Sequence, residues 1–161
     1  MAEKILVSAC LLGAPVRYNG KDKKSDHAVL QRWIDEGRVV SVCPEVLGGL
    51  GTPRPPAEIV YASSLRRVTT NGGQDVTAEF ERGAAETLQQ ALRHGARVAI
   101  LKEGSPSCGT SFVYDGTFTS TPVPGDGVAA ALLRSHGIRV FSEHELDAAA
   151  AYVASLDETP A

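Results

Sequence analysis

Residues 75–101 read DVTAEFERGAAETLQQALRHGARVAIL and combine a helix pattern with a strand pattern. Apolar or small side chains recur there at every fourth position: Val76, Phe80, Ala84, Leu88 and Leu92. This spacing predicts an amphipathic helix over 75–94, which Gly95 ends. The uninterrupted apolar run that follows, 97–101, predicts a buried strand. A helix that leads directly into a buried strand is typical of a βαβ unit, in which the strands are parallel.

The same alternation extends in both directions from this stretch. Short apolar runs at 5–7, 39–42 and 138–141 predict three further buried strands, and the spacing elsewhere predicts helices over 26–36, 128–135 and 143–156. Ser25 or Asp26 is the expected cap of the first helix. Such alternation predicts an α/β fold: a Rossmann-like open parallel sheet flanked by helices, in one domain over 1–161 with its core at about 4–156. Residues 48–67 are rich in Gly and Pro, and we expect an irregular segment that shapes a site.

Composition limits the classes of protein that this chain can belong to. The 161 residues are 43% apolar and 22% charged, which is typical of a globular domain. A net charge of −3 argues against a strongly basic surface for nucleic acid, and no apolar run is long enough to span a membrane. The N-terminus lacks the apolar core of a signal peptide, and the three cysteines are an odd number. We therefore expect a cytoplasmic protein without a disulfide framework.

The three cysteines each follow a different predicted strand. Cys10 follows the first strand, Cys43 the second, and Cys108 lies shortly after the third. Because the carboxyl ends of parallel strands share one edge of a sheet, these thiols are expected to converge there. Converging thiolates bind a soft metal, either zinc with a fourth ligand or an iron–sulfur cluster, and spacing alone does not choose between them. The alternative is that each cysteine is a small buried apolar residue.

Polar residues near the cysteines suggest chemistry at this edge. Glu45 lies two residues after Cys43, where it could act as a general acid or base, or could be a solvated loop charge. Ser105 and Ser107 could position a substrate or form local turns. Cationic side chains that could bind a polar substrate are Arg17, Arg54 and Lys102. The four histidines lie in or near the ends of predicted helices and are not expected to be ligands, and no nucleotide-binding motif is present.

Three motifs in order resemble those of the thiouracil desulfidase family, long catalogued as a domain of unknown function. The first is SACLLG at 8–13 with RYNG at 17–20, and the second is CPEVLGGL at 43–50 with Pro53, Arg54 and Glu58. The third is KEGSPSCG at 102–109, followed by YDGTF at 114–118. The resemblance extends from about Lys4 to Glu143 and adds Tyr18 to the candidate substrate-binding residues.

This resemblance implies a cofactor, a reaction and roles for several residues. The cofactor would be a [4Fe–4S] cluster held by only three cysteines, which correspond to Cys10, Cys43 and Cys108. Its fourth iron would remove sulfur from a thiolated pyrimidine base, such as 2-thiouracil, without net redox change. The acid/base carboxylate of the family corresponds to Glu45 and its active-site serine to Ser105. The expected partner is a small thiolated base, with neither nucleic acid nor membrane involved.

Two other functions are compatible with the residues. The first is a hydrolase or transferase with one cysteine as nucleophile, which needs a nearby base, usually a histidine. The second is a metal-binding module without turnover, for example a zinc site. Replacement of the cysteines one at a time distinguishes a single nucleophile from a set of ligands, and an assay of sulfide release distinguishes turnover from binding.

Overall fold

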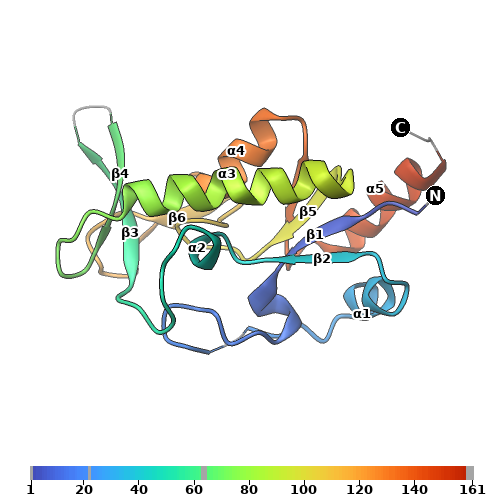
Figure 1. The fold of residues 1–161 in the computed structure, drawn as a ribbon, viewed down its shortest axis with the longest axis horizontal. Helices are drawn as coiled ribbons and strands as arrows, with labels where there is room; N and C mark the ends of the chain where they lie inside the picture. The colour runs from blue at the N-terminus through green and yellow to red at the C-terminus, as the bar shows by residue number, and fades with distance from the viewer. Residues whose placement is uncertain (1, 22, 63–64, 159–161) are drawn as a thin grey trace.

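A four-stranded parallel sheet is the centre of the computed structural model, which describes residues 2–21, 23–62 and 65–158 (Figure 1). Its strands are β1 (Ile5–Ser8), β2 (Val39–Val42), β5 (Val98–Leu101) and β8 (Arg139–Ser142), in the spatial order β2-β1-β5-β8. The chain leaves β1 toward β2 on one side and later fills the other side with β5 and β8. The point where the order reverses therefore lies between β1 and β5, and ligands of such sheets bind outside the carboxyl ends of the strands there.

Two helices cover each face of this sheet. Helices α1 (Ala28–Asp35) and α5 (Leu146–Glu158) pack on one face, where they meet Ile5 and Val7 of β1. Helices α3 (Thr77–His94) and α4 (Val128–Ser135) pack on the other face, where they meet Leu6. Adjacent residues of β1 contact opposite layers because side chains alternate along a strand, and all three are fully buried. The α/β prediction and its parallel sheet are confirmed.

The helix boundaries differ from the predicted ones at three N-termini, and α3 begins at Thr77 rather than at 75. Helix α1 begins at Ala28, and its cap is His27, whose Nδ1 accepts a hydrogen bond of 3.1 Å from Val29 N, so the expected cap at Ser25 or Asp26 is wrong. Helix α5 begins at Leu146 rather than at 143, because Ser142–Glu145 form a hydrogen-bonded turn first. Helix α3 ends as predicted at Gly95, whose φ of 63° lies in the left-handed region. Among the described residues, no helix is both long enough and apolar enough to cross a membrane.

Two hairpins lie beyond the carboxyl ends of the sheet strands, and neither was predicted (Figure 1). Strands β3 (Ala57–Ala62) and β4 (Leu65–Thr70) pair antiparallel, as do β6 (Phe112–Tyr114) and β7 (Pro122–Pro124). The expectation of an irregular segment over 48–67 is therefore wrong from Ala57 onward, where Ile59 pairs with Val68 and both are buried. The prolines before β3 and within β7 hide the strand pattern because proline is unfavourable inside a sheet.

Two short helices follow the first two strands and begin the wall of a pocket. The 3-10 helix η1 (Ala9–Leu12) follows β1, and α2 (Pro44–Leu47) follows β2. Helix α2 packs directly on the backbone of α3, because a Cβ on Gly83 would lie 1.8 Å from the Pro44 carbonyl oxygen. A Cβ on Gly48 would likewise lie 1.9 Å from the Glu79 carbonyl oxygen. Glycine at both positions thus permits the close approach that fixes α2.

Candidate functional site

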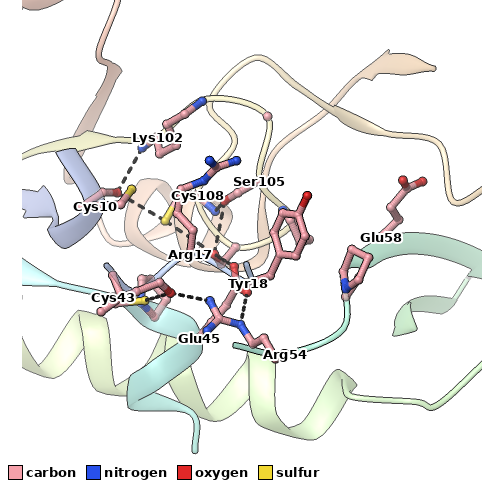
Figure 2. Close-up of a pocket in the computed structure, with 18 of the residues that line it drawn as sticks. Cys10, Arg17, Tyr18, Cys43, Glu45, Arg54, Glu58, Lys102, Ser105 and Cys108 are labelled. Atoms are coloured by element: carbon pink, nitrogen blue, oxygen red, sulfur yellow. Dashed lines mark hydrogen bonds and ion pairs between the residues drawn. The ribbon is translucent and has the colours of Figure 1, made fainter. Parts of the chain in front are cut away.

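A pocket of about 480 Å³ opens at the carboxyl ends of β1, β2 and β5 (Figure 2). This is the edge of the sheet at which the order of the strands predicts a ligand site. The pocket lining includes all ten candidate residues that the sequence suggests: Cys10, Arg17, Tyr18, Cys43, Glu45, Arg54, Lys102, Ser105, Ser107 and Cys108. The structure therefore brings together segments that are far apart in the sequence.

The three cysteines reach the pocket from three different elements. Cys10 lies on η1, Cys43 caps the N-terminus of α2, and Cys108 lies in the loop after β5. All three are free thiols, and Cys10 and Cys108 are buried. The loop that carries Cys108 is seated on the N-terminus of α4, where the backbone N–H of Val128 donates to the Pro106 carbonyl at 2.8 Å. Ser8 of β1 donates to Cys108 Sγ at 3.5 Å and so ties this loop to the sheet.

Burial makes all three thiols hard to ionise. It raises the pKa of Cys10 to about 11, with a further contribution from nearby Cys43, and that of Cys108 to about 12. Burial also raises the pKa of Cys43. A neutral thiol is a poor nucleophile, whereas a metal that binds to it displaces the proton and supplies compensating charge. This electrostatic environment favours metal ligation over an isolated nucleophile.

The placement of these donors bears on which metal they suit. Among the described residues, no three His, Cys, Asp or Glu side chains lie close enough together to hold a single metal ion. A tetrahedral zinc site needs sulfurs about 2.3 Å from one ion, so its ligands must be in near contact. The three thiols instead surround a shared cavity. Three soft donors that line one cavity suit an iron–sulfur cluster.

A hydrogen-bonded chain connects a carboxylate of α2 to the loop after β5. Ser107 Oγ donates to Glu45 Oε2 at 2.8 Å, and Ser105 Oγ lies 3.3 Å from Ser107 Oγ. Because the hydroxyl of Ser107 donates to the carboxylate, the hydroxyl of Ser105 is the donor in the second bond. The backbone N–H of Cys108 donates in turn to Ser105 Oγ at 2.7 Å. Glu45 is therefore coupled to both serines and to the loop of a cysteine.

Arg54 holds the other oxygen of this carboxylate. Its Nε lies 3.0 Å from Glu45 Oε1, and the two side chains are only 8% and 13% exposed. The rest of the guanidinium donates to the carbonyl oxygens of Val16 and Gly51, both at 2.9 Å, and to the Thr52 hydroxyl. Arg54 thus cross-links three segments of the pocket wall. This geometry gives it a positioning role, so its predicted contact with substrate stays a prediction.

Two further cationic residues line the pocket, and each has a neighbour that orients it. Lys102 Nζ lies 3.1 Å from Glu143 Oε2 and donates to the Glu103 carbonyl at 2.8 Å. The Arg17 guanidinium lies 5.8 Å from the centroid of the Tyr18 ring, within the range of a cation–π contact. Their predicted role in substrate binding is compatible with these positions and stays a prediction.

Glu103, which was not among the candidate residues, organises the loop that carries the serines and Cys108. One carboxylate oxygen accepts the backbone N–H groups of Thr110 and Ser111 at 2.6 and 3.0 Å, and the other accepts their hydroxyls at 2.6 and 2.9 Å. Burial alone would raise the pKa of Glu103, but these hydrogen bonds outweigh it and lower the pKa to about 2. The signals in the sequence were its place in the motif KEGSPSCG and its charge directly before a Gly-Ser-Pro-Ser turn.

The histidines are placed as the sequence suggested. None of the four is among the residues that line the pocket: His27, His94, His136 and His144. His27 caps α1, and His94 lies in the last turn of α3. A cysteine nucleophile that relies on an adjacent imidazole therefore has no base in this pocket.

Fold and site together define a Rossmann-like α/β protein with a three-thiol pocket at the switch point of its sheet. The chain belongs to the 2-thiouracil desulfurase family, whose match spans residues 5–145. The Bacillus subtilis (strain 168) protein YbbK is 46% identical over 149 residues, which cover 89% of this chain and 97% of that protein. A solved structure of the [4Fe-4S]-dependent thiouracil desulfidase TudS is 51% identical, with a TM-score of 0.90, and covers 96% of this chain and 99% of that one. The family resemblance noted in the sequence is confirmed.

Proposed function

We propose that this chain is a desulfidase that exchanges the sulfur of a thiolated pyrimidine base, such as 2-thiouracil, for oxygen. The observation that carries the proposal is the meeting of three soft thiol donors and one hydrogen-bonded carboxylate in a single pocket. In the balanced reaction, the base and one water give the corresponding oxo base and hydrogen sulfide, so neither an oxidant nor a reductant is needed. Support comes from the family and from the similarity to TudS, which is [4Fe-4S]-dependent.

Cys10, Cys43 and Cys108 would hold a [4Fe–4S] cluster. With three protein ligands, such a cluster would supply one iron open to a soft sulfur atom, on which it would act as a Lewis acid. The presence of all three thiols in the lining of one cavity supports this ligand set.

Glu45 would be the residue that moves protons. A carboxylate has about four lone-pair positions, and the bonds from Arg54 and Ser107 use two of them. The remaining positions can accept a proton from the water that attacks the ring carbon of the C=S group. Ser105 and Ser107 connect this carboxylate to the third cysteine loop and can pass a proton along their hydroxyls. General acid–base catalysis of this type contributes about 10²–10⁴-fold to a rate.

Iron loading and single cysteine replacements test this function. After anaerobic reconstitution, we expect about four irons and four sulfides per chain and sulfide release from 2-thiouracil. Cys10→Ser, Cys43→Ser and Cys108→Ser should each lose the visible absorption of the cluster and the activity. Ser155→Ala, at an exposed position on α5, is the matched control and should retain both.

Three outcomes would contradict the proposal. Stoichiometric zinc with no iron uptake would indicate a zinc module. Loss of activity in only one of the three cysteine variants would indicate a nucleophile mechanism. A fully loaded protein that releases no sulfide from any thiolated base would indicate a cluster protein with another function.

A further inference from the structure

The pocket has two chemically different ends. Figure 2 shows Cys10, Cys43 and Cys108 toward one end and Glu58 at the opposite end, with the Tyr18 ring between them. Glu58 lies on β3, in the hairpin that the sequence did not predict. Three aromatic side chains contribute to the lining away from the sheet: Tyr18, Tyr114 and Phe118. We call the end with Glu58 and these aromatic side chains the aromatic end. The proposed mechanism uses the cysteine end and assigns no task to the aromatic end.

Glu58 fixes the loop that joins β6 to β7. Its Oε1 accepts the backbone N–H of Gly116 at 2.9 Å and that of Phe118 at 3.1 Å. The sequence separation is 58 positions for the bond from Gly116 and 60 positions for the bond from Phe118. The loop also presses directly on β3, because a Cβ on Gly116 would lie 2.8 Å from the Ile59 carbonyl oxygen. The carboxylate and this close approach together hold the loop against β3.

Phe118 has an unusual backbone conformation at the point that Glu58 holds. Its φ is 59°, in the left-handed region that residues other than glycine seldom adopt. Such a conformation persists where the surroundings enforce it, and it is concentrated at functional sites. Phe118 is half-buried and lines the pocket, whereas its neighbours Thr117 and Thr119 are exposed. The loop therefore places one large apolar side chain at the pocket.

The orientation of a bound base follows from the proposed function, on which this inference rests. The C=S group must point toward the cysteine end, where sulfur is removed. In a pyrimidine ring, carbon C5 lies directly opposite C2, so a C5 substituent of 2-thiouracil points away from the cysteines. It therefore points toward the aromatic end. We propose that Phe118 is a specificity-determining residue that limits the size of this substituent, and that Glu58 is the positioning residue that holds Phe118 in place.

A ratio of two substrates measured on one preparation tests this proposal. The ratio is kcat/KM for 2-thiouracil bearing a propyl group on C5 divided by kcat/KM for 2-thiouracil itself. Phe118→Ala should raise the ratio about tenfold, the size expected when a pocket gains room for one or two methylene groups. Incomplete cluster loading or partial unfolding lowers both rates equally and leaves the ratio unchanged. A ratio that stays at the wild-type value in Phe118→Ala would overturn the proposal.

The positioning role of Glu58 has its own conservative variant. Glu58→Ala removes the acceptor for both N–H groups and should raise the ratio in the same direction as Phe118→Ala. Glu58→Gln retains a carbonyl oxygen that can accept them and should keep the wild-type ratio. Thr119→Ala, in the same loop but exposed and outside the pocket lining, is the matched control. Equal ratios in Glu58→Ala and the wild type would overturn the positioning role.

Binding of the oxo products separates this inference from the proposed function. Calorimetry of the cluster-loaded protein with uracil and with C5-propyluracil needs no turnover. The wild type should bind uracil more tightly than C5-propyluracil. In Phe118→Ala the affinity for C5-propyluracil relative to that for uracil should rise about tenfold. If loaded wild-type protein releases no sulfide, the proposed function fails, while the binding ratio still decides the role of Phe118. An unchanged binding ratio would count against Phe118 even in an active enzyme.

Discussion

The central sheet and the wall of the pocket are stabilised in different ways. In the sheet, adjacent residues such as Leu6 and Val7 are fully buried between two helix layers, and backbone ladders join the strands. In the wall, loops are joined by carboxylates: Glu45 connects α2 to Arg54 and Ser107, and Glu58 and Glu103 each hold a loop. Apolar packing therefore sets where each loop begins, and hydrogen-bonded carboxylates set its shape. Changes to the wall should affect chemistry and local order more than the sheet.

Among changes to the wall that leave the cysteines intact, the largest effect on chemistry is expected from Glu45→Gln. The amide retains the size of the side chain but is a far weaker proton acceptor, so turnover should fall about 10²-fold, or by roughly 3 kcal/mol of barrier. The visible absorption of the reconstituted cluster should remain, because Glu45 is not one of the proposed cluster ligands. Rates of sulfide release and absorption spectra of the same sample are the measurements. Undiminished sulfide release with an intact cluster would exclude Glu45 as the base and would make Ser105 the next candidate.

An effect of similar size, on stability rather than on chemistry, is expected from Glu103→Gln. The pKa of Glu103 is about 2 in the folded chain, below its ordinary value of 4.5. The ionised carboxylate therefore stabilises the fold at pH values above 4.5. This stabilisation is lost as pH falls from about 4.5 toward about 2, and at neutral pH it corresponds to about 3 kcal/mol. Urea unfolding at pH 7 should therefore show a clearly lower free energy of unfolding in the variant than in the wild type. At pH 3 the difference should be smaller.

The control for this comparison is Glu86→Gln. Glu86 is an exposed carboxylate on α3, and its replacement should leave the unfolding midpoint close to that of the wild type at both values of pH. A deficit in Glu103→Gln that is equal at pH 7 and pH 3 would show that the carboxylate charge is not its source.

The sheet was predictable from sequence because its signals are local. Apolar runs such as Val98–Leu101 and the four-residue spacing of α3 follow directly from burial in a layered fold. The convergence of the cysteines on one edge also follows from parallel strands, and the structure places all three at one pocket. The motifs for the family resemblance were present in the same way, as continuous stretches.

The wall was less predictable because its contacts join distant segments. Nothing local to Arg54 indicates that its donors go to Glu45 and Val16, since these partners lie 9 and 38 positions away. The β3–β4 hairpin was missed because the prolines before it suggested irregular chain. Glu58 was noted only as part of a motif, because its two acceptor bonds depend on a loop about 60 residues further along. Long-range pairs of this kind leave no periodic signal in a sequence.

The smallest effect that separates two roles is expected from Arg54→Lys. Lysine keeps the positive charge, but a single ammonium group cannot reach the four acceptors that the guanidinium holds, so the carboxylate of Glu45 loses part of its orientation. As a positioning residue, Arg54 should then affect kcat, with a fall of about tenfold, roughly 1.4 kcal/mol, and little change in KM. If Arg54 instead binds substrate directly, KM should rise while kcat stays near the wild-type value. The matched control is Arg93→Lys, at an exposed position in the last turn of α3, which should leave both constants unchanged. A raised KM with an unchanged kcat in Arg54→Lys would return Arg54 to the substrate-binding role that its sequence position suggested.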